Sequence, residues 1–169
     1  MTQKGYPFQL IAIEKNVTDP FQIDTLVYGF KSKKSGHQYQ VRIERYVEHL
    51  NCIKFFDETT DTDKGKFSKL SGTYEPRTIF RTVAEIAFDA LKRDSAASFA
   101  FIGAADEKDK TRGKNRRYRV YTTFLKDLGI SEQFHPVFFD EQSVCILVNI
   151  KEIDDIEAYL YRIIKFFYE

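Results

Sequence analysis

The sequence predicts an α+β fold in which about three helices pack on a mainly antiparallel sheet. Apolar residues alternate with polar ones in the first third of the chain, whereas from residue 76 they recur at the spacing of an α-helix. Clusters of Gly, Pro, Asn, Asp and Ser separate these segments. The expected order of elements is therefore β-β-β-β-α-β-α-β-β-α. The 169 residues, 43% of them hydrophobic, suffice for a core, and no repeat or linker divides residues 1–169, so we expect a single domain.

Four strands are expected before residue 57. Residues 8–13 fit a first strand, and residues 25–31 and 37–47 fit a hairpin. In the second arm of the hairpin, apolar side chains alternate with polar ones, which predicts one buried and one wet face; the apolar ones are Tyr39, Val41 and Ile43. The connection between the arms contains Gly36, which tolerates a positive φ. A further strand at Cys52–Phe56 extends the meander.

The segment of about residues 57–75 is polar and lacks periodicity, so we expect a flexible loop there. Its first part, residues 57–66, contains four acidic residues, but their spacing is not the Asp-x-Asp-x-Asp-Gly pattern of a calcium loop. We therefore expect no metal site in this loop.

Helical spacing begins at Pro76, which suits the first turn of a helix that ends near Arg93. The expected apolar stripe of this helix consists of Ile79, Phe80, Val83, Ile86, Ala87, Ala90 and Leu91. Ser98–Gly103 then fits a buried strand. A second helix is expected over Asn115–Leu128, with Gly129 at its end.

A second hairpin and a third helix complete the expected fold. Residues 137–140 and 144–149 fit the hairpin, with the turn at residues 140–143. The last helix is expected to begin after Asp154 and Asp155, because acidic residues suit the positive end of the helix dipole. Its apolar stripe runs from Ile156 to Phe167.

Composition excludes several classes of protein. The net charge of +1 argues against a general coat for nucleic acid or membrane. The first residues are polar rather than a secretory signal, and no apolar run approaches the roughly 20 residues of a membrane span, so we expect a cytoplasmic protein that does not enter the membrane. Cys52 and Cys145 lie in apolar runs and are expected in the core; a disulfide or a reactive thiol is the alternative.

Positive charge is concentrated between Asp106 and Arg119. This segment has seven Lys or Arg and three Asp or Glu, a local charge of +4, so the rest of the chain sums to −3. Asn115 is a good N-cap for the helix expected after it, but Arg116 and Arg117 then carry the wrong sign of charge for its first turn. An anion at the helix start would resolve this conflict.

The candidate ligand-binding residues are therefore Lys114, Asn115, Arg116, Arg117, Tyr118 and Arg119. Tyr118 is the aromatic residue free to stack on a base, whereas Tyr121 fits the core stripe of the helix. The alternative is a solvated loop whose arginines pair with Asp106, Glu107 and Asp109. No glycine-rich phosphate fingerprint is present.

Three functional hypotheses stay open, and the sequence does not decide whether the protein is an enzyme. The first is a module that binds a phosphate-bearing partner, nucleic acid included, through residues 106–119. The second is an acetyltransferase-like enzyme. The third is a protein-interaction module or homodimer that uses aromatic residues such as Phe138, Phe139 and 166–168. No cofactor is predicted, and no metal site, because His37, His49 and His135 lack ligands at metal spacing.

The order of elements after about residue 25 resembles the later part of the GCN5-related N-acetyltransferase fold. In that family a strand meander leads to a helix, a strand, a second helix and a final hairpin. The run from Asn115 through Tyr121 to Leu128-Gly129 is similar to the family's late helix. The resemblance implies an acyl-coenzyme A ligand, the helix at Pro76 as the cofactor end, and Tyr121 or Tyr118 as proton donor. The family's Arg/Gln-x-x-Gly-x-Gly/Ala pyrophosphate loop is replaced here by residues 75–81, Glu-Pro-Arg-Thr-Ile-Phe-Arg.

A second resemblance rests on the opening Tyr6-Pro-Phe8 and on the run from Phe101 through Asn115 to Tyr121. These segments are similar to a family of small proteins of unknown function from Bacteroidetes-type bacteria. The resemblance implies a bacterial cytoplasmic protein and no particular activity.

Overall fold

The computed structural model describes residues 4–16, 18–59, 76–102, 132–139 and 144–168. They form one seven-stranded sheet in the order β1-β2-β3-β4-β5-β7-β6. Five neighbouring pairs are antiparallel, and only the central pair of β4 and β5 is parallel. The mainly antiparallel α+β fold that the sequence predicts is thus confirmed.

The strands follow the predicted segments closely. They are β1 Phe8–Lys15, β2 Gln22–Lys31, β3 Gln38–Tyr46, β4 Leu50–Asp57, β5 Ser98–Ile102, β6 Phe134–Phe139 and β7 Val144–Asn149. Gly36 has a φ of 75° in the β2–β3 connection, as predicted. Two expected boundaries are wrong: Asp57 is the last residue of β4 rather than part of a loop, and β6 begins three residues before Val137.

Three helices occur in the described part of the chain. Helix α1 spans Pro76–Arg93, as predicted, and connects β4 to β5. Helix α3 spans Ile156–Ile163, and Asp155 caps it by accepting a hydrogen bond from the Ala158 amide. The expected single C-terminal helix is interrupted at Ile164, after which α4 covers Lys165–Tyr168. Phe166 packs on the rings of Phe21 and Tyr46. We infer that these tertiary contacts outweigh the apolar stripe, which alone predicts one continuous helix.

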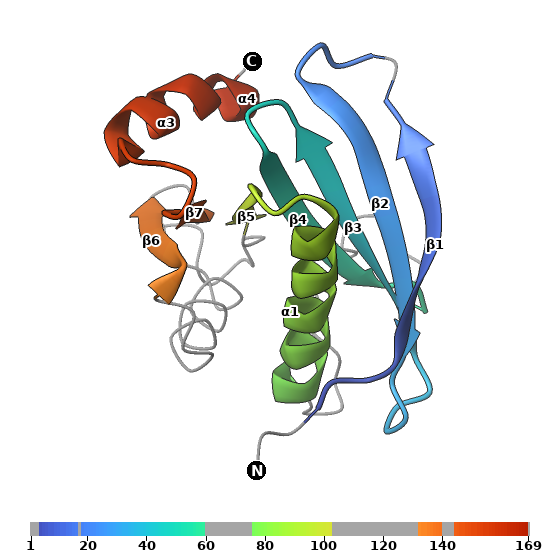
Figure 1. Cartoon of the computed structure of the whole chain (residues 1–169). Helices are drawn as coiled ribbons and strands as arrows, with labels where there is room; N and C mark the ends of the chain where they lie inside the picture. The colour runs from blue at the N-terminus through green and yellow to red at the C-terminus, as the bar shows by residue number, and fades with distance from the viewer. Residues whose placement is uncertain (1–3, 17, 60–75, 103–131, 140–143, 169) are drawn as a thin grey trace, which may run out of the picture.

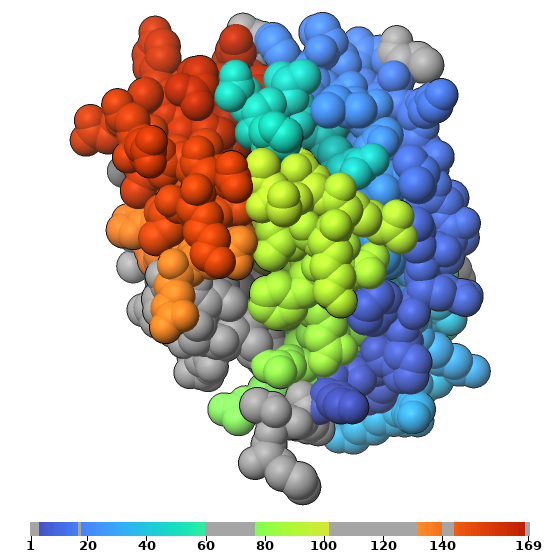
Figure 2. All heavy atoms as spheres, viewed as in Figure 1, coloured from blue at the N-terminus to red at the C-terminus, as the bar shows by residue number. Residues whose placement is uncertain are grey.

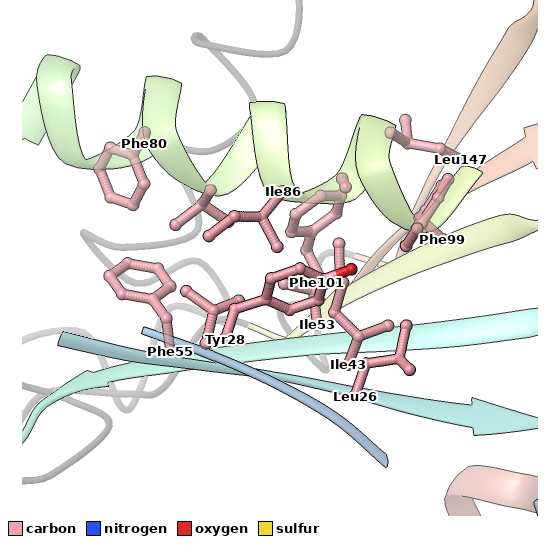
Figure 3. Close-up of a cluster of buried hydrophobic side chains, with 14 of the residues drawn as sticks. Leu26, Tyr28, Ile43, Ile53, Phe55, Phe80, Ile86, Phe99, Phe101 and Leu147 are labelled. Atoms are coloured by element: carbon pink, nitrogen blue, oxygen red, sulfur yellow. The ribbon is translucent and has the colours of Figure 1, made fainter. Parts of the chain in front are cut away.

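The main core lies between α1 and one face of the sheet (Figure 3). Tyr39, Val41 and Ile43 are buried there, which confirms the alternation predicted for β3. The stripe of α1 is buried along its length, except for Leu91, which is partly buried against the same core. The described start of the chain lies against α1 (Figure 2), where the Gly5 and Tyr6 amides donate to Glu85 and Thr82.

A second core lies on the opposite face of the sheet, under α3. Its buried members are Leu50, Cys52, Ala100, Ile146, Val148, Tyr159 and Ile163. Along β4, even-numbered Leu50 and Cys52 face α3, whereas odd-numbered Ile53 and Phe55 face α1. The sheet is therefore covered on both faces where β4 and β5 pair.

Some expectations fall outside the described residues. These are most of the polar loop of about residues 57–75, the helix expected over Asn115–Leu128, and the turn at residues 140–143. Within the part of the chain that the structure describes, no helix combines the length and apolar character that crossing a membrane requires.

Candidate functional site

The most distinctive feature of the sheet is the carboxyl end of its parallel strand pair, β4 and β5. Their parallel pairing runs from Leu50 opposite Ser98 to Ile53 opposite Phe101. Strand β4 then continues to Asp57, still paired with β3, while β5 follows β7 to Ile102. The described part of β5 thus ends just after its pairing with β4, whereas β4 continues to Asp57. Ligands of α/β sheets bind outside the carboxyl ends of parallel strands, so this carboxyl edge is the candidate site.

Helix α1 begins at the same edge. The Phe55 ring of β4 meets the Phe80 ring of α1 edge-on, with ring centroids 5.4 Å apart. Asp57 lies two residues beyond Phe55, roughly 7 Å along the strand, and Pro76 lies four residues before Phe80, roughly 6 Å along the helix. Both therefore extend a similar distance toward the carboxyl edge. The first turn of α1, residues 76–79, contains no acidic residue but carries the exposed Arg77.

A histidine and a buried carboxylate meet at this edge. Nδ1 of His37, in the β2–β3 connection, lies 2.6 Å from Oδ2 of Asp57. The other carboxylate oxygen, Oδ1, accepts hydrogen bonds from the amide of Thr59 at 2.9 Å and from its hydroxyl at 2.6 Å. The Asp57 side chain is 6% exposed and that of His37 is 38% exposed. The imidazole is thus held through Nδ1 by a buried carboxylate and stays partly exposed to solvent.

The backbone also fixes His37. Its amide donates to the Ser35 hydroxyl at 3.1 Å, and its carbonyl accepts from the Ser32 amide at 2.9 Å. Gly36 supplies the left-handed residue that this connection needs just before the histidine. The residue is therefore held by its side chain and by its backbone.

The opposite edge of the sheet carries a similar pair. Nδ1 of His49 lies 2.8 Å from Oδ2 of Asp94, and the Asp94 Oδ1 accepts from the Ala96 amide at 3.2 Å. Here the imidazole is 63% exposed and the carboxylate 25% exposed. Figure 1 shows the β3–β4 turn near α3 and α4, away from the β2–β3 turn and the start of α1. We call the sheet edge at the β3–β4 turn the amino edge, because β4 and β5 both begin there.

Several contacts tie the β3–β4 turn to its surroundings. Glu48 and His49 both have positive φ, 64° and 55°, which is unusual for residues with side chains. The Tyr159 hydroxyl donates to the Glu48 carbonyl at 3.0 Å, and the Ser98 amide donates to the His49 carbonyl at 2.9 Å. Burial raises the pKa of Tyr159 to about 12, so this hydroxyl keeps its proton at neutral pH. The amino edge is thus a dense structural clamp.

A polar strip lies on the α1 face between these two edges. Arg45 binds Asp24 through two hydrogen bonds of 2.6 Å, from Nε and Nη2, and this contact raises the pKa of Arg45. The Tyr28 hydroxyl donates to Asp89 at 2.6 Å; burial and then this carboxylate raise the pKa of Tyr28 to about 12. These groups are satisfied by one another, as buried polar groups in a structural role are.

Neither cysteine is suited to nucleophilic chemistry. Cys52 and Cys145 are buried on opposite faces of the sheet, as free thiols. Burial raises the pKa of each thiol to about 12, so neither is a thiolate near neutral pH. The core role predicted for both residues is confirmed, and the disulfide and reactive-thiol alternatives are wrong.

The basic residues predicted as ligand contacts, Lys114–Arg119, lie outside the described residues, so this site stays a prediction. Their segment follows β5 along the chain, and β5 ends at the carboxyl edge. Sequence reasoning missed the pair of His37 and Asp57, which are 20 residues apart. The register that places Tyr39 opposite Asp57 brings the two residues together, and the predicted strands do not specify this register.

Two further expectations concern metals and partners. Within the described ranges, His, Cys, Asp and Glu form no cluster of three or more that would hold a metal ion. Of the aromatic residues proposed for a partner surface, Phe138 is 37% exposed, whereas Phe166 and Phe167 pack partly buried beside α3. The homodimer stays a prediction.

Comparisons of the chain with protein-family models, with curated proteins and with solved structures found no match. No relative therefore supplies a function by similarity. The carboxyl edge, with the ends of the parallel strands, the helix start and His37 beside Asp57, is the basis for the functional inference.

Proposed function

We propose that the protein binds a phosphate-bearing ligand at the carboxyl edge of β4 and β5, through Lys114, Asn115, Arg116, Arg117, Tyr118 and Arg119. The observation that carries the proposal is the carboxyl end of the only parallel strand pair among the described elements, where α1 also begins. The segment with a local charge of +4, residues 106–119, follows β5 in the sequence.

Electrostatics support an anion at this edge. The backbone amides at the start of α1 carry the partial positive charge of a helix N-terminus, and Arg77 adds a full charge without an acidic neighbour in that turn. Arginines of the segment after β5 add charge of the same sign. A ligand with several phosphates would satisfy both groups of charge, and nucleic acid or a nucleotide-containing cofactor meets that description.

The proposal is tested by titrating the protein with a single-stranded oligonucleotide at several salt concentrations. The affinity should fall steeply with salt, and changing Arg116 and Arg117 to Ala should lower it. The slope of log affinity against log salt should become shallower by about 1 for each phosphate that is no longer neutralised. Changing the exposed Lys92 and Lys151 to Ala is the matched control, because it removes the same charge elsewhere. Equal reductions of affinity in the two double variants would contradict a specific site.

A second candidate is an acyl-coenzyme A dependent transferase. The observation that favours it is the order of the described elements: a meander, helix α1, the parallel strand β5 and the closing hairpin of β6 and β7. This order supports the resemblance to the GCN5-related N-acetyltransferase fold. Coenzyme A carries a pyrophosphate and a further phosphate, so it also fits the proposed anion site.

Calorimetry separates the two candidates. Acetyl-coenzyme A should release heat on binding and raise the melting temperature if the second candidate is right. Tight oligonucleotide binding without any response to acetyl-coenzyme A would support the nucleic-acid version. Absence of both signals would contradict the proposed ligand class.

A further inference from the structure

We propose that His37 and Asp57 form an acid–base dyad, in which Nε2 of His37 accepts a proton from a nucleophile during acyl transfer at the carboxyl edge. The inference rests on the proposed function for the identity of the acyl carrier, a phosphate-bearing thioester. It does not rest on that function for the dyad itself, which consists of described residues only.

The hydrogen bonds fix which ring nitrogen is the acceptor. An ionised carboxylate only accepts hydrogen bonds, so Nδ1 of His37, 2.6 Å from Asp57 Oδ2, must carry the proton. In the neutral ring Nε2 then has a free lone pair. Among the residues that the structure describes, Nε2 has no hydrogen-bond partner. Asp57 is thus the positioning residue, and His37 presents a proton acceptor to solvent.

The surroundings of Asp57 make this arrangement rigid. Its carboxylate is 6% exposed, and Thr59 occupies its second oxygen through two hydrogen bonds. The positive charge that develops on the imidazole during proton transfer would face this buried carboxylate. A buried carboxylate stabilises such a charge more than an exposed one, because water screens it less.

The chemical step follows from the free Nε2. An amine or water attacks the acyl carbon, its proton passes to Nε2, and the new bond to carbon forms. The bond from carbon to the leaving sulfur breaks with its electron pair, and the imidazolium returns the proton to that sulfur. The buried, protonated state of Cys52 and Cys145 argues against an acyl-cysteine intermediate, so the acyl group passes directly to the nucleophile.

The chain contains its own control for this proposal. His49 and Asp94 repeat the same contact at the amino edge, with a more exposed imidazole. If simple exposure of an imidazole sufficed, His49 would be the better base. If a buried positioning carboxylate and the carboxyl edge matter, His37 is the better base.

The test measures hydrolysis of 4-nitrophenyl acetate, an acyl ester that needs no phosphate site. His37→Gln should lower the protein-dependent rate roughly 100-fold, as expected for removal of general-base catalysis, whereas His49→Gln should leave it unchanged. Asp57→Asn should lower the rate while circular dichroism shows an intact fold. Long-range proton–nitrogen NMR of the folded parent protein should show the Nδ1-protonated form of His37.

The outcomes separate this inference from the proposed ligand site. Equal rates for His37→Gln and His49→Gln, or an Nε2-protonated His37, would overturn the dyad. Loss of oligonucleotide and coenzyme A binding in the Arg116 and Arg117 variant, together with loss of ester hydrolysis in His37→Gln but not in His49→Gln, supports both ideas. If the parent protein binds neither phosphate ligand and His37→Gln still abolishes hydrolysis, the dyad is supported and the ligand site is contradicted.

Discussion

The two histidine–carboxylate pairs lie at opposite ends of the β3–β4 hairpin and use the same contacts. In each pair one carboxylate oxygen meets Nδ1 of the histidine and the other binds a backbone amide two residues ahead. They differ in place and burial: Asp57 is 6% exposed at the carboxyl edge, whereas Asp94 is 25% exposed at the amino edge. A hydrogen-bond motif therefore does not define a role by itself. We infer the role of each pair from the edge of the sheet at which it lies and from the burial of its carboxylate.

The amino edge has the features of a structural clamp. The Glu48 carbonyl, the His49 carbonyl and the His49 ring are each bound by a different element, namely α3, β5 and the end of α1. Such contacts hold two residues in a left-handed conformation that costs roughly 1 kcal/mol or more for each. At the carboxyl edge, the His37 ring is held through Nδ1 by Asp57 at the end of β4.

The two carboxylates should differ most clearly in their contribution to stability. Asp57→Ala leaves three donors without their acceptor and should lower the free energy of unfolding by about 2–3 kcal/mol. Asp94→Ala should cost about 1 kcal/mol, because its carboxylate is more exposed and water replaces part of its role. Urea denaturation of both variants measures the difference. Equal losses of unfolding free energy would contradict the argument that the more buried carboxylate contributes more to stability.

Alkaline pH should weaken the amino-edge clamp. The pKa of Tyr159 is raised from 10.0 to about 12, so its contribution to stability is fully present below pH 10 and is lost as the pH rises toward 12. The pKa of Tyr28 is also raised to about 12, so its contribution to stability is lost over the same pH range. Thermal melts between about pH 9 and 12 should show a falling melting temperature, and Tyr159→Phe should fall less steeply than the parent. His37→Gln should keep the parent's slope; a flat parent curve would contradict the clamp.

Smaller effects are expected in the two connections of the meander. Gly36→Ala should lower stability by about 1 kcal/mol, because its φ of 75° strains any side chain. Glu48→Asn should raise stability by about 0.5 kcal/mol, since Asn tolerates a positive φ and the exposed ion pair to Arg162 contributes little. Chemical denaturation resolves both changes. Destabilisation by Glu48→Asn would mean that the Arg162 contact matters more than the backbone strain.

Much of the fold could be predicted from local patterns. Period-two alternation identified β3 and its buried face, and the 3.6-residue spacing with Pro76 gave the bounds of α1. The start of β6 was missed because His135-Pro136 argues against a strand. Proline lacks an amide donor, yet among the described strands β6 lies at the edge of the sheet, where proline is tolerated.

The candidate site could be predicted only in part. Local charge predicted a binding site at residues 106–119. These residues lie outside the described part of the chain, so the site stays a prediction. The parallel pairing of β4 with β5 depends on long-range packing, which no local pattern encodes. His37 and Asp57 meet only when the register of β3 on β4 is known, so the dyad needed the structure.

We expect the protein to meet its ligand at the carboxyl edge and not at the amino edge. NMR addresses this most directly, by following backbone amide signals while coenzyme A and, separately, a single-stranded oligonucleotide are added. The signals of His37, Asp57 and Arg77 should shift with at least one of these ligands, while those of Glu48, His49 and Asp94 stay unchanged. Shifts confined to the amino edge, or no shift with either ligand, would contradict a ligand site at the carboxyl edge.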